Sequence, residues 1–244
     1  MKHLLILILS LLLFSCTTGM KMAFKDPASV KKIDLSRNHL DKIPDQVFKC
    51  ENLEELILFK NNLKEIPPQI GQLKKLQKLV VGRNDIVTVA PEIGELSELR
   101  YFSAMFNDIK VLPPEFGKLK GLVTVNLEYN KLESLPDEIG ELQNLSYLQL
   151  NNNKLKGLPS AIIKLQSLRT LNLYRNEIRK IPDNIDELTQ LYELNLAFSG
   201  PSNFPSTLCK LNRLEILYVD QYAQPPYCTQ TRVRPRFNLI ILQQ

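Results

Sequence analysis

Residues 122–132 read LVTVNLEYNKL, and residues 135–142 read LPDEIGEL. The apolar–polar–apolar alternation at 125–127 is typical of a short strand that buries one face. Asn130 predicts a bend out of that strand, because its side-chain amide can pair with backbone groups that the bend leaves free. Pro136 ends strand pairing because it lacks an N–H, and the later apolar residues have helical or 3-10 spacing.

The same pattern returns every 23 residues over most of the chain. Ile33 opens the first unit and Leu217 follows the eighth, so residues 33–216 hold eight complete units. The sixth position carries an asparagine in seven of them: Asn38, Asn61, Asn84, Asn107, Asn130, Asn153 and Asn176. One unit cannot bury its own apolar face, but stacked units bury it against each other. The repeat therefore predicts a solenoid.

These units resemble leucine-rich repeats. The motif Leu-x-x-Leu-x-Leu-x-x-Asn-x-Leu stands at Leu122 to Leu132, and the extension Leu-Pro-x-x-Ile-Gly-x-Leu stands at Leu135 to Leu142. The resemblance implies an α/β fold of one kind: a curved leucine-rich-repeat solenoid. Its parallel β-sheet would line the concave face, and short helical or 3-10 segments would line the convex face.

Both ends of the repeat array depart from the pattern. In the eighth unit Ser199 replaces the asparagine and Pro201 an apolar residue, which predicts an irregular coil. Residues 217–244 are expected to form a C-terminal cap, whose apolar end at 239–242 could cover the last coil. Residues 23–32 are expected to form the N-terminal cap. Such caps are needed because terminal coils otherwise expose core and sheet edge.

The N-terminus has the layout of a targeting segment. Lys2 precedes an apolar run from Leu4 to Phe14, which is too short to span a bilayer, and small residues follow. Residues 1–15 are therefore predicted to be a signal peptide. The last four residues of this region, 13–16, resemble the lipobox of bacterial lipoproteins, in which the cysteine carries the lipid. The resemblance implies lipid attachment at Cys16, with residues 16–22 as a lipidated tether.

Spirochaete leucine-rich-repeat lipoproteins are the family that the chain resembles when these features are taken together. Those proteins share the 23-residue unit, an exported N-terminus that is often lipidated, and a start of the repeats similar to residues 23–35. The resemblance implies a bacterial cell-envelope location, at the outer membrane or cell surface, with the membrane contacted through the lipid anchor.

The predicted concave face carries apolar and aromatic residues in its early coils, where a solvated strand face would be polar. Aromatic residues and methionine are enriched in interface cores, and exposed apolar patches mark interaction sites. We therefore expect a protein or other macromolecular partner on this face. The candidate binding residues are Ile57, Phe59, Val80, Tyr101, Met105, Phe106, Tyr129 and Tyr147. Unrelated exposed residues on a stiff scaffold remain the alternative.

Basic residues recur at the fifth position of the first three units, at Arg37, Lys60 and Arg83. They are expected to line up as a basic edge beside the sheet, which could meet an acidic partner or could be an ordinary solvated edge. The formal net charge of +5 is mild for 244 residues and is not typical of a nucleic-acid-binding protein.

The four cysteines divide by position. Cys50 stands where other units have leucine, so a buried core cysteine is expected. Cys209 and Cys228 lie near the C-terminal cap and could form a disulfide in an oxidising compartment, but sequence does not fix their separation.

No catalytic, cofactor or metal-binding constellation stands out in the sequence. There are two histidines, and Gly117-Lys118 is followed by Leu119, so it fails as a phosphate-binding loop. We predict a non-enzymatic, exported and lipid-anchored binding protein without a cofactor. The alternatives are an envelope scaffold facing the periplasm, or a cytosolic regulator of the small-GTPase-binding type if the N-terminus is not a signal peptide.

Overall fold

The structure is a computed structural model, and it describes residues 26–200, 204–230 and 237–243. The predicted signal peptide, the lipid attachment at Cys16 and the tether at 16–22 lie outside the described residues. In the described part, no helix is both long and apolar enough to cross a membrane.

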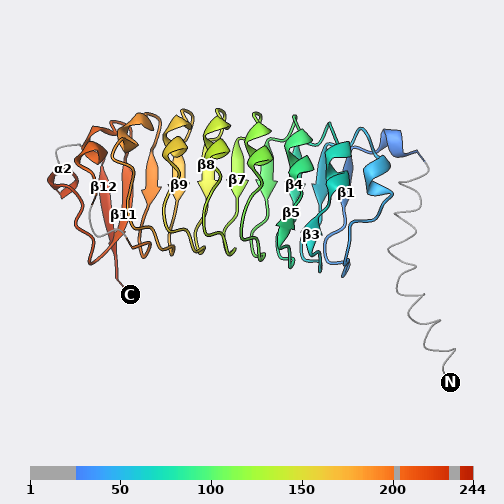
Figure 1. Cartoon of the computed structure of the whole chain (residues 1–244), viewed down its shortest axis with the longest axis horizontal. Helices are drawn as coiled ribbons and strands as arrows, with labels where there is room; N and C mark the ends of the chain where they lie inside the picture. The colour runs from blue at the N-terminus through green and yellow to red at the C-terminus, as the bar shows by residue number, and fades with distance from the viewer. Residues whose placement is uncertain (1–25, 201–203, 231–236, 244) are drawn as a thin grey trace, which may run out of the picture.

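One parallel sheet runs the length of the molecule (Figure 1). Between adjacent strands from β1 to β11 the register steps by one repeat, as in Ile33 beside Leu56 and Leu56 beside Leu79. In order across the sheet, the strands of the described part are β1 (Lys32–Asp34), β2 (Glu55–Ile57), β4 (Lys78–Val80), β6 (Tyr101–Ser103), β7 (Thr124–Asn126), β8 (Tyr147–Gln149), β9 (Thr170–Asn172), β10 (Glu193–Asn195), β11 (Ile216–Asp220) and β12 (Asn238–Leu242).

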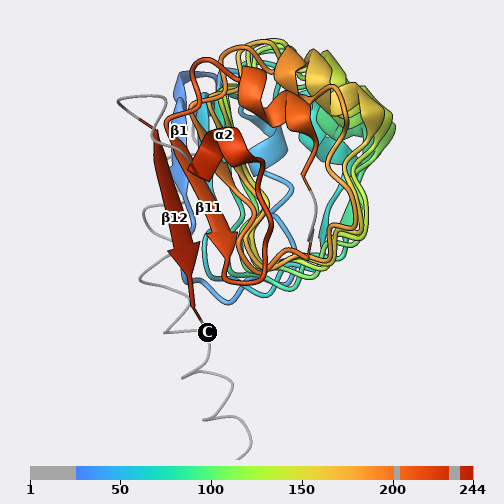
Figure 2. The same ribbon diagram turned by 90° about the vertical axis from the view of Figure 1, so that its left-hand side faces the viewer.

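Short 3-10 segments form the opposite layer (Figure 2). From η3 to η7 each begins directly after, or at, the proline of its unit, because proline fixes φ and needs no partner for an N–H. The segments are η1 (Pro27–Ser29), η2 (Val47–Lys49), η3 (Pro68–Gln72), η4 (Pro91–Glu95), η5 (Pro114–Lys118), η6 (Asp137–Glu141), η7 (Ser160–Lys164), η8 (Ile185–Glu187) and η9 (Ser206–Lys210). A two-stranded sheet, β3 (Glu65–Ile66) with β5 (Thr88–Val89), and a short helix, α2 (Tyr227–Gln230), complete the elements.

The core lies between the sheet and the 3-10 layer and is continuous along the stack. The repeated apolar positions fill it: Leu56, Leu79, Phe102 and Val125 are fully buried in successive strands of the sheet. Phe102 and Phe116 pack edge to face with ring centroids 5.4 Å apart. The parallel sheet, the 3-10 segments and the shared core confirm the predicted leucine-rich-repeat solenoid.

The repeated asparagines form a buried ladder between coils. Asn84 accepts a bond from the backbone N–H of Leu63 in the preceding coil, at 3.1 Å. Its amide donates to the carbonyls of Leu58 at 3.0 Å and Val81 at 2.9 Å. Backbone groups buried at the bend are thus paired by a side chain, which is why the position carries asparagine.

Close approach of neighbouring coils explains the glycine that follows the buried isoleucine or phenylalanine of the 3-10 segments. A Cβ placed on Gly117 would overlap the backbone carbonyl oxygen of Glu138, and one on Gly140 would overlap that of Ala161. Any larger residue there would push the 3-10 segments apart.

The ladder changes at the eighth unit. Ser199 is buried, and its hydroxyl donates to the Leu196 carbonyl of its own coil, because a serine side chain is too short to reach the previous coil as asparagine does. Gly200 follows with φ +101°, in the left-handed region that glycine tolerates. Pro201 lies outside the described residues.

The C-terminal segment adds strands to the end of the stack. β12 pairs in parallel with β11, with Leu217 beside Leu239. A disulfide joins Cys209, in η9, to Cys228, in α2, with their Cα atoms 5.8 Å apart. The bridge ties the last 3-10 segment to the chain beyond β11. Cys50 is a fully buried free cysteine, and its burial raises the pKa of the thiol.

Candidate functional site

The exposed face of the sheet presents three rows of side chains. In each repeat strand the middle residue is buried, while the first and third face outward, as in Glu55 and Ile57 around Leu56. The second residue after each strand, such as Phe59, adds the third row. Parallel pairing stacks equivalent residues of successive coils beside one another.

Four predicted binding residues form one apolar patch on this face: Ile57, Phe59, Val80 and Met105. Ile57 lies beside Val80 in the register of β2 and β4. Phe59 and Met105 come from coils on either side of Gly82, and a Cβ built on Gly82 would lie 3.4 Å from Phe59 Cδ2 and 3.0 Å from Met105 Cγ. Both side chains therefore close over the glycine, and all four remain half-buried.

Tyr101 lies at the charged border of this patch. The Lys78 ammonium is 5.7 Å from the centroid of its ring. Next to Lys78, Glu55 forms an ion pair with Lys32 at 2.9 Å, and hydrogen bonding from Lys32 is the main reason that the pKa of Glu55 is lowered. The apolar patch is thus bordered on the upstream side of the strands by alternating charges and one tyrosine.

The predicted basic edge and two predicted aromatic residues form a single column on the other side of the patch. Arg37, Lys60, Arg83, Phe106 and Tyr129 occupy the same repeat position, and all five have a left-handed backbone with φ between 52° and 60°. Cross-coil bonds hold this uncommon conformation: the N–H of Lys60 donates to Gly82 O at 2.9 Å, and that of Arg83 to Met105 O at 2.8 Å. We call these five residues the left-handed column.

Side chains stack within the column. The Arg83 guanidinium lies 4.7 Å from the Phe106 ring centroid. Phe106 and Tyr129 are stacked, with centroids 4.2 Å apart and planes inclined by 7°. Among the described residues, Arg37, Lys60 and Arg83 form no ion pair with a carboxylate. The column therefore presents positive charge that merges into an aromatic stack.

Tyr147 lies outside the apolar patch. In the sheet register Thr124 stands between Tyr101 and Tyr147, so the two tyrosines are two coils apart. Tyr147 is 42% exposed and lines a separate hollow with Arg169 and Tyr192.

A second aromatic and basic cluster was missed from the sequence. Tyr174 packs edge to face against Phe198 with centroids 5.6 Å apart, and the Arg175 guanidinium lies 5.2 Å from the Tyr174 centroid. Arg175 and Phe198 continue the repeat position of the left-handed column, which is the signal that could have found them.

Side chains with catalytic or metal-binding chemistry do not cluster in the described part of the chain. No group of three or more His, Cys, Asp or Glu side chains there could hold a metal ion. The arrangement offers surface recognition: an apolar patch, stacked rings and unpaired cations on a stiff sheet.

Family comparisons agree with this architecture. Residues 28–86 match the family described as Leucine rich repeat, residues 88–175 match Leucine-rich repeat region, and residues 167–188 match Leucine Rich Repeat. The chain is a leucine-rich-repeat protein. This fold is typical of non-enzymatic domains that bind protein or peptide ligands. No curated protein matches this leucine-rich-repeat chain in sequence.

Solved structures of leucine-rich-repeat proteins are similar over most of the chain. A TDR receptor is 25% identical with a TM-score of 0.74, covering 88% of this chain and 39% of the receptor. The plant peptide hormone receptor RGFR1, solved in complex with RGF2, is 28% identical with a TM-score of 0.65, covering 73% and 30%. An internalin (inlF) of Listeria monocytogenes has the same fold at 19% identity, with a TM-score of 0.72 and coverage of 91% and 63%. The chain thus spans less than two thirds of each of these relatives.

Proposed function

We propose that this is an exported, lipid-anchored leucine-rich-repeat protein that binds a protein partner through the apolar patch and the left-handed column. The observation that carries the proposal is the closure of Phe59 and Met105 over Gly82. It makes a continuous apolar surface across three coils, flanked by the stacked Phe106 and Tyr129 rings. Such a surface has the composition of an interface core.

The rigidity of the site favours binding. The sheet and the cross-coil hydrogen bonds hold the patch in place before a partner arrives, so little conformational entropy is lost on association. The similar receptor RGFR1 was solved with RGF2 bound, which supports a peptide or protein ligand here.

Export is supported by two independent features. The first is the signal-peptide layout of residues 1–15 followed by the lipobox-like Cys16. The second is the Cys209–Cys228 disulfide, because disulfides persist in oxidising compartments and are rare in the cytosol. The disulfide also weighs against a cytosolic GTPase-type regulator. We propose that the protein lies at the bacterial cell envelope, on the outer membrane or cell surface.

The anchor is tested by labelling cells with a fatty-acid analogue. Wild-type protein should take up the label, and the Cys16→Ala variant should not. Equal labelling of the two would refute lipidation at Cys16. Protease treatment of intact cells then separates surface display from the periplasm-facing scaffold, since a protected protein argues for the scaffold.

The binding face is tested by cross-linking partners to the purified full chain and measuring the affinity of the captured protein. Phe59→Ser and Met105→Ser should each weaken binding about tenfold or more, because truncating an anchor side chain at the centre of an interface costs ~2 kcal/mol or more. The matched control is Tyr222→Ser, which alters a tyrosine that is 75% exposed outside the patch. Unchanged affinity in both patch variants would move the binding site elsewhere.

A further inference from the structure

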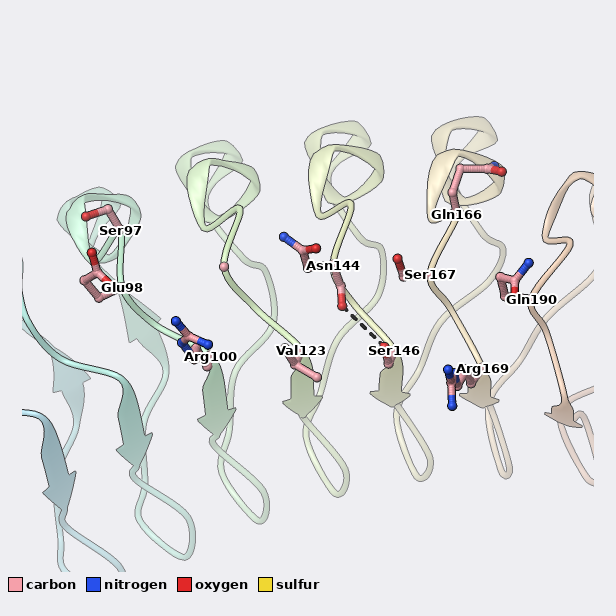
Figure 3. Close-up of a pocket in the computed structure, with 11 residues that line it drawn as sticks. Ser97, Glu98, Arg100, Val123, Asn144, Ser146, Gln166, Ser167, Arg169 and Gln190 are labelled. Atoms are coloured by element: carbon pink, nitrogen blue, oxygen red, sulfur yellow. Dashed lines mark hydrogen bonds between the residues drawn. The ribbon is translucent and has the colours of Figure 1, made fainter.

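A polar groove runs across the coils just before their strands, away from the apolar patch (Figure 3). Its volume is about 770 Å³, and it extends from the loop before β6 to the loop before β10. Arg100 and Arg169 lie on its strand side, with Val123 and Ser146 between them (Figure 3). A second hollow of about 670 Å³ adjoins it and shares Arg169 and Gln190.

Small side chains create this groove. In the first coils the same edge is bridged from coil to coil: Lys31 pairs with Glu54 at 2.8 Å, and Lys75 Nζ donates to Asn52 Oδ1 at 2.7 Å. In the groove, Gly121, Val123, Ser146 and Ser167 hold corresponding positions and are too short or apolar for such side-chain bridges, while Asn144 reaches only the backbone carbonyl of Lys120. The edge is therefore open where the earlier coils close it.

The two arginines are exposed, and among the described residues neither forms an ion pair with a carboxylate. Glu98 also lines the groove, toward the 3-10 layer and on the side away from the strands (Figure 3). The strand side thus carries two unneutralised guanidinium groups, which are suited to bidentate recognition of carboxylates.

The spacing of the arginines limits what can bridge them. They occupy the same position in coils three repeats apart, and at ~4.8 Å per strand the separation is about 14 Å. An extended peptide rises ~3.3 Å per residue, so about four residues cover this span. Residues four apart in an extended chain also point to the same side.

The other residues that line the groove offer hydrogen-bond acceptors for the main chain of a peptide. The backbone of this edge is already paired, for example Ser146 N with Val123 O at 2.9 Å, so a ligand meets side chains. Asn144 donates its amide to Lys120 O at 2.8 Å, and Gln166 donates to Ile163 O at 2.9 Å. In the part of the chain that the structure describes, no donor bonds to their side-chain oxygens, so these oxygens can accept N–H groups from a ligand.

We propose that this groove binds an extended acidic segment of a protein, with one carboxylate on Arg100 and a second, four residues along, on Arg169. The site is separate from the apolar patch and goes beyond the function proposed above. Phe59→Ser should leave it unaffected, so failure of one proposal does not imply failure of the other.

The test uses the full chain and fluorescein-labelled Gly/Ser peptides in an anisotropy titration. A peptide with two glutamates separated by three residues should bind more tightly than one with adjacent glutamates, and a Gln-substituted peptide should not bind. Arg100→Gln and Arg169→Gln should each weaken binding about fivefold, and the double variant about 25-fold, as expected for distant exposed charge contacts. Both arginines are exposed, so the variants should keep the circular dichroism of the parent.

The control variant is Arg179→Gln, which removes an exposed arginine outside the groove and should leave the affinity unchanged. No binding, no dependence on glutamate spacing, or an equal loss in the control would overturn the proposal. So would binding of a sulfated oligosaccharide through the two arginines when the peptides do not bind.

Discussion

Replacing Asn130 by alanine removes one rung of the buried asparagine ladder in the middle of the solenoid. Asn130 is 7% exposed. Its Oδ1 accepts the N–H of Ile109 at 3.0 Å, and its Nδ2 donates to Ala104 O at 2.9 Å and Leu127 O at 3.1 Å. Nδ2 also donates to Glu128 O at 3.3 Å, and that carbonyl accepts the N–H of Phe106 as well. The substitution deletes all four bonds at once.

The hydrogen-bond partners of Asn130 are affected unequally by this substitution. Ala104 O still accepts from Asn107 at 2.9 Å, and Leu127 O still accepts from Asn153 at 2.9 Å. Among the described residues, the buried N–H of Ile109 has no second acceptor and is left unpaired. An orphaned buried donor costs ~1–3 kcal/mol. Each further lost bond costs only ~0.5 kcal/mol because its carbonyl acceptor keeps a second donor, so the free energy of unfolding should fall by about 3 kcal/mol.

Urea unfolding of the full chain, followed by circular dichroism, measures this loss. With an m-value of about 3 kcal/mol/M, the midpoint should fall by about 1 M. The matched control is Asn144→Ala, because Asn144 is exposed and donates a single bond to Lys120 O. That variant should lose less than about 1 kcal/mol. Equal midpoints for the two variants would refute the role given to the ladder.

Three further predictions concern stability and titration. Gly117→Ala should destabilise the protein by ~1–3 kcal/mol, because the new Cβ overlaps Glu138 O. Gly157→Ala should stabilise the protein slightly, because a Cβ on Gly157 has no atom within 4 Å. Equal thermal midpoints for the two variants would contradict this. Replacing Cys209 and Cys228 together by serine should lower the free energy of unfolding by ~3 kcal/mol for a 19-residue separation, and urea midpoints unchanged from wild type would count against it. Hydrogen bonds from Ser36, chiefly from its hydroxyl, lower the pKa of Asp34. Asp34 therefore contributes stability at pH values above its ordinary pKa, and this contribution is lost as the pH falls through the lowered pKa. Ser36→Ala should raise the pKa of Asp34 in an NMR titration, and an unchanged pKa would show that the hydroxyl is unimportant.

Much of the fold followed from the sequence because its determinants recur at fixed spacing. Residues such as Leu56, Leu79 and Val125 marked the core, and Asn130 marked the bend. The candidate binding residues could be assigned to a face for the same reason. Which of them touch could not be assigned, because contact between coils depends on side-chain size at neighbouring positions. Gly82 leaves the space that the side chains of Phe59 and Met105 approach from either side, and Thr124 separates Tyr147 from Tyr101.

The spacing of apolar residues, the asparagine and the proline is enough to specify a repeating coil with one buried face, because these residues act within a unit and between identical neighbours. The features of the surface depend on how side chains of different coils pack together. The shared left-handed backbone places Arg83, Phe106 and Tyr129 in one stack. The packing of coils leaves a groove between Arg100 and Arg169. These features join side chains one to three coils apart, and the local pattern that builds each coil places no constraint on them.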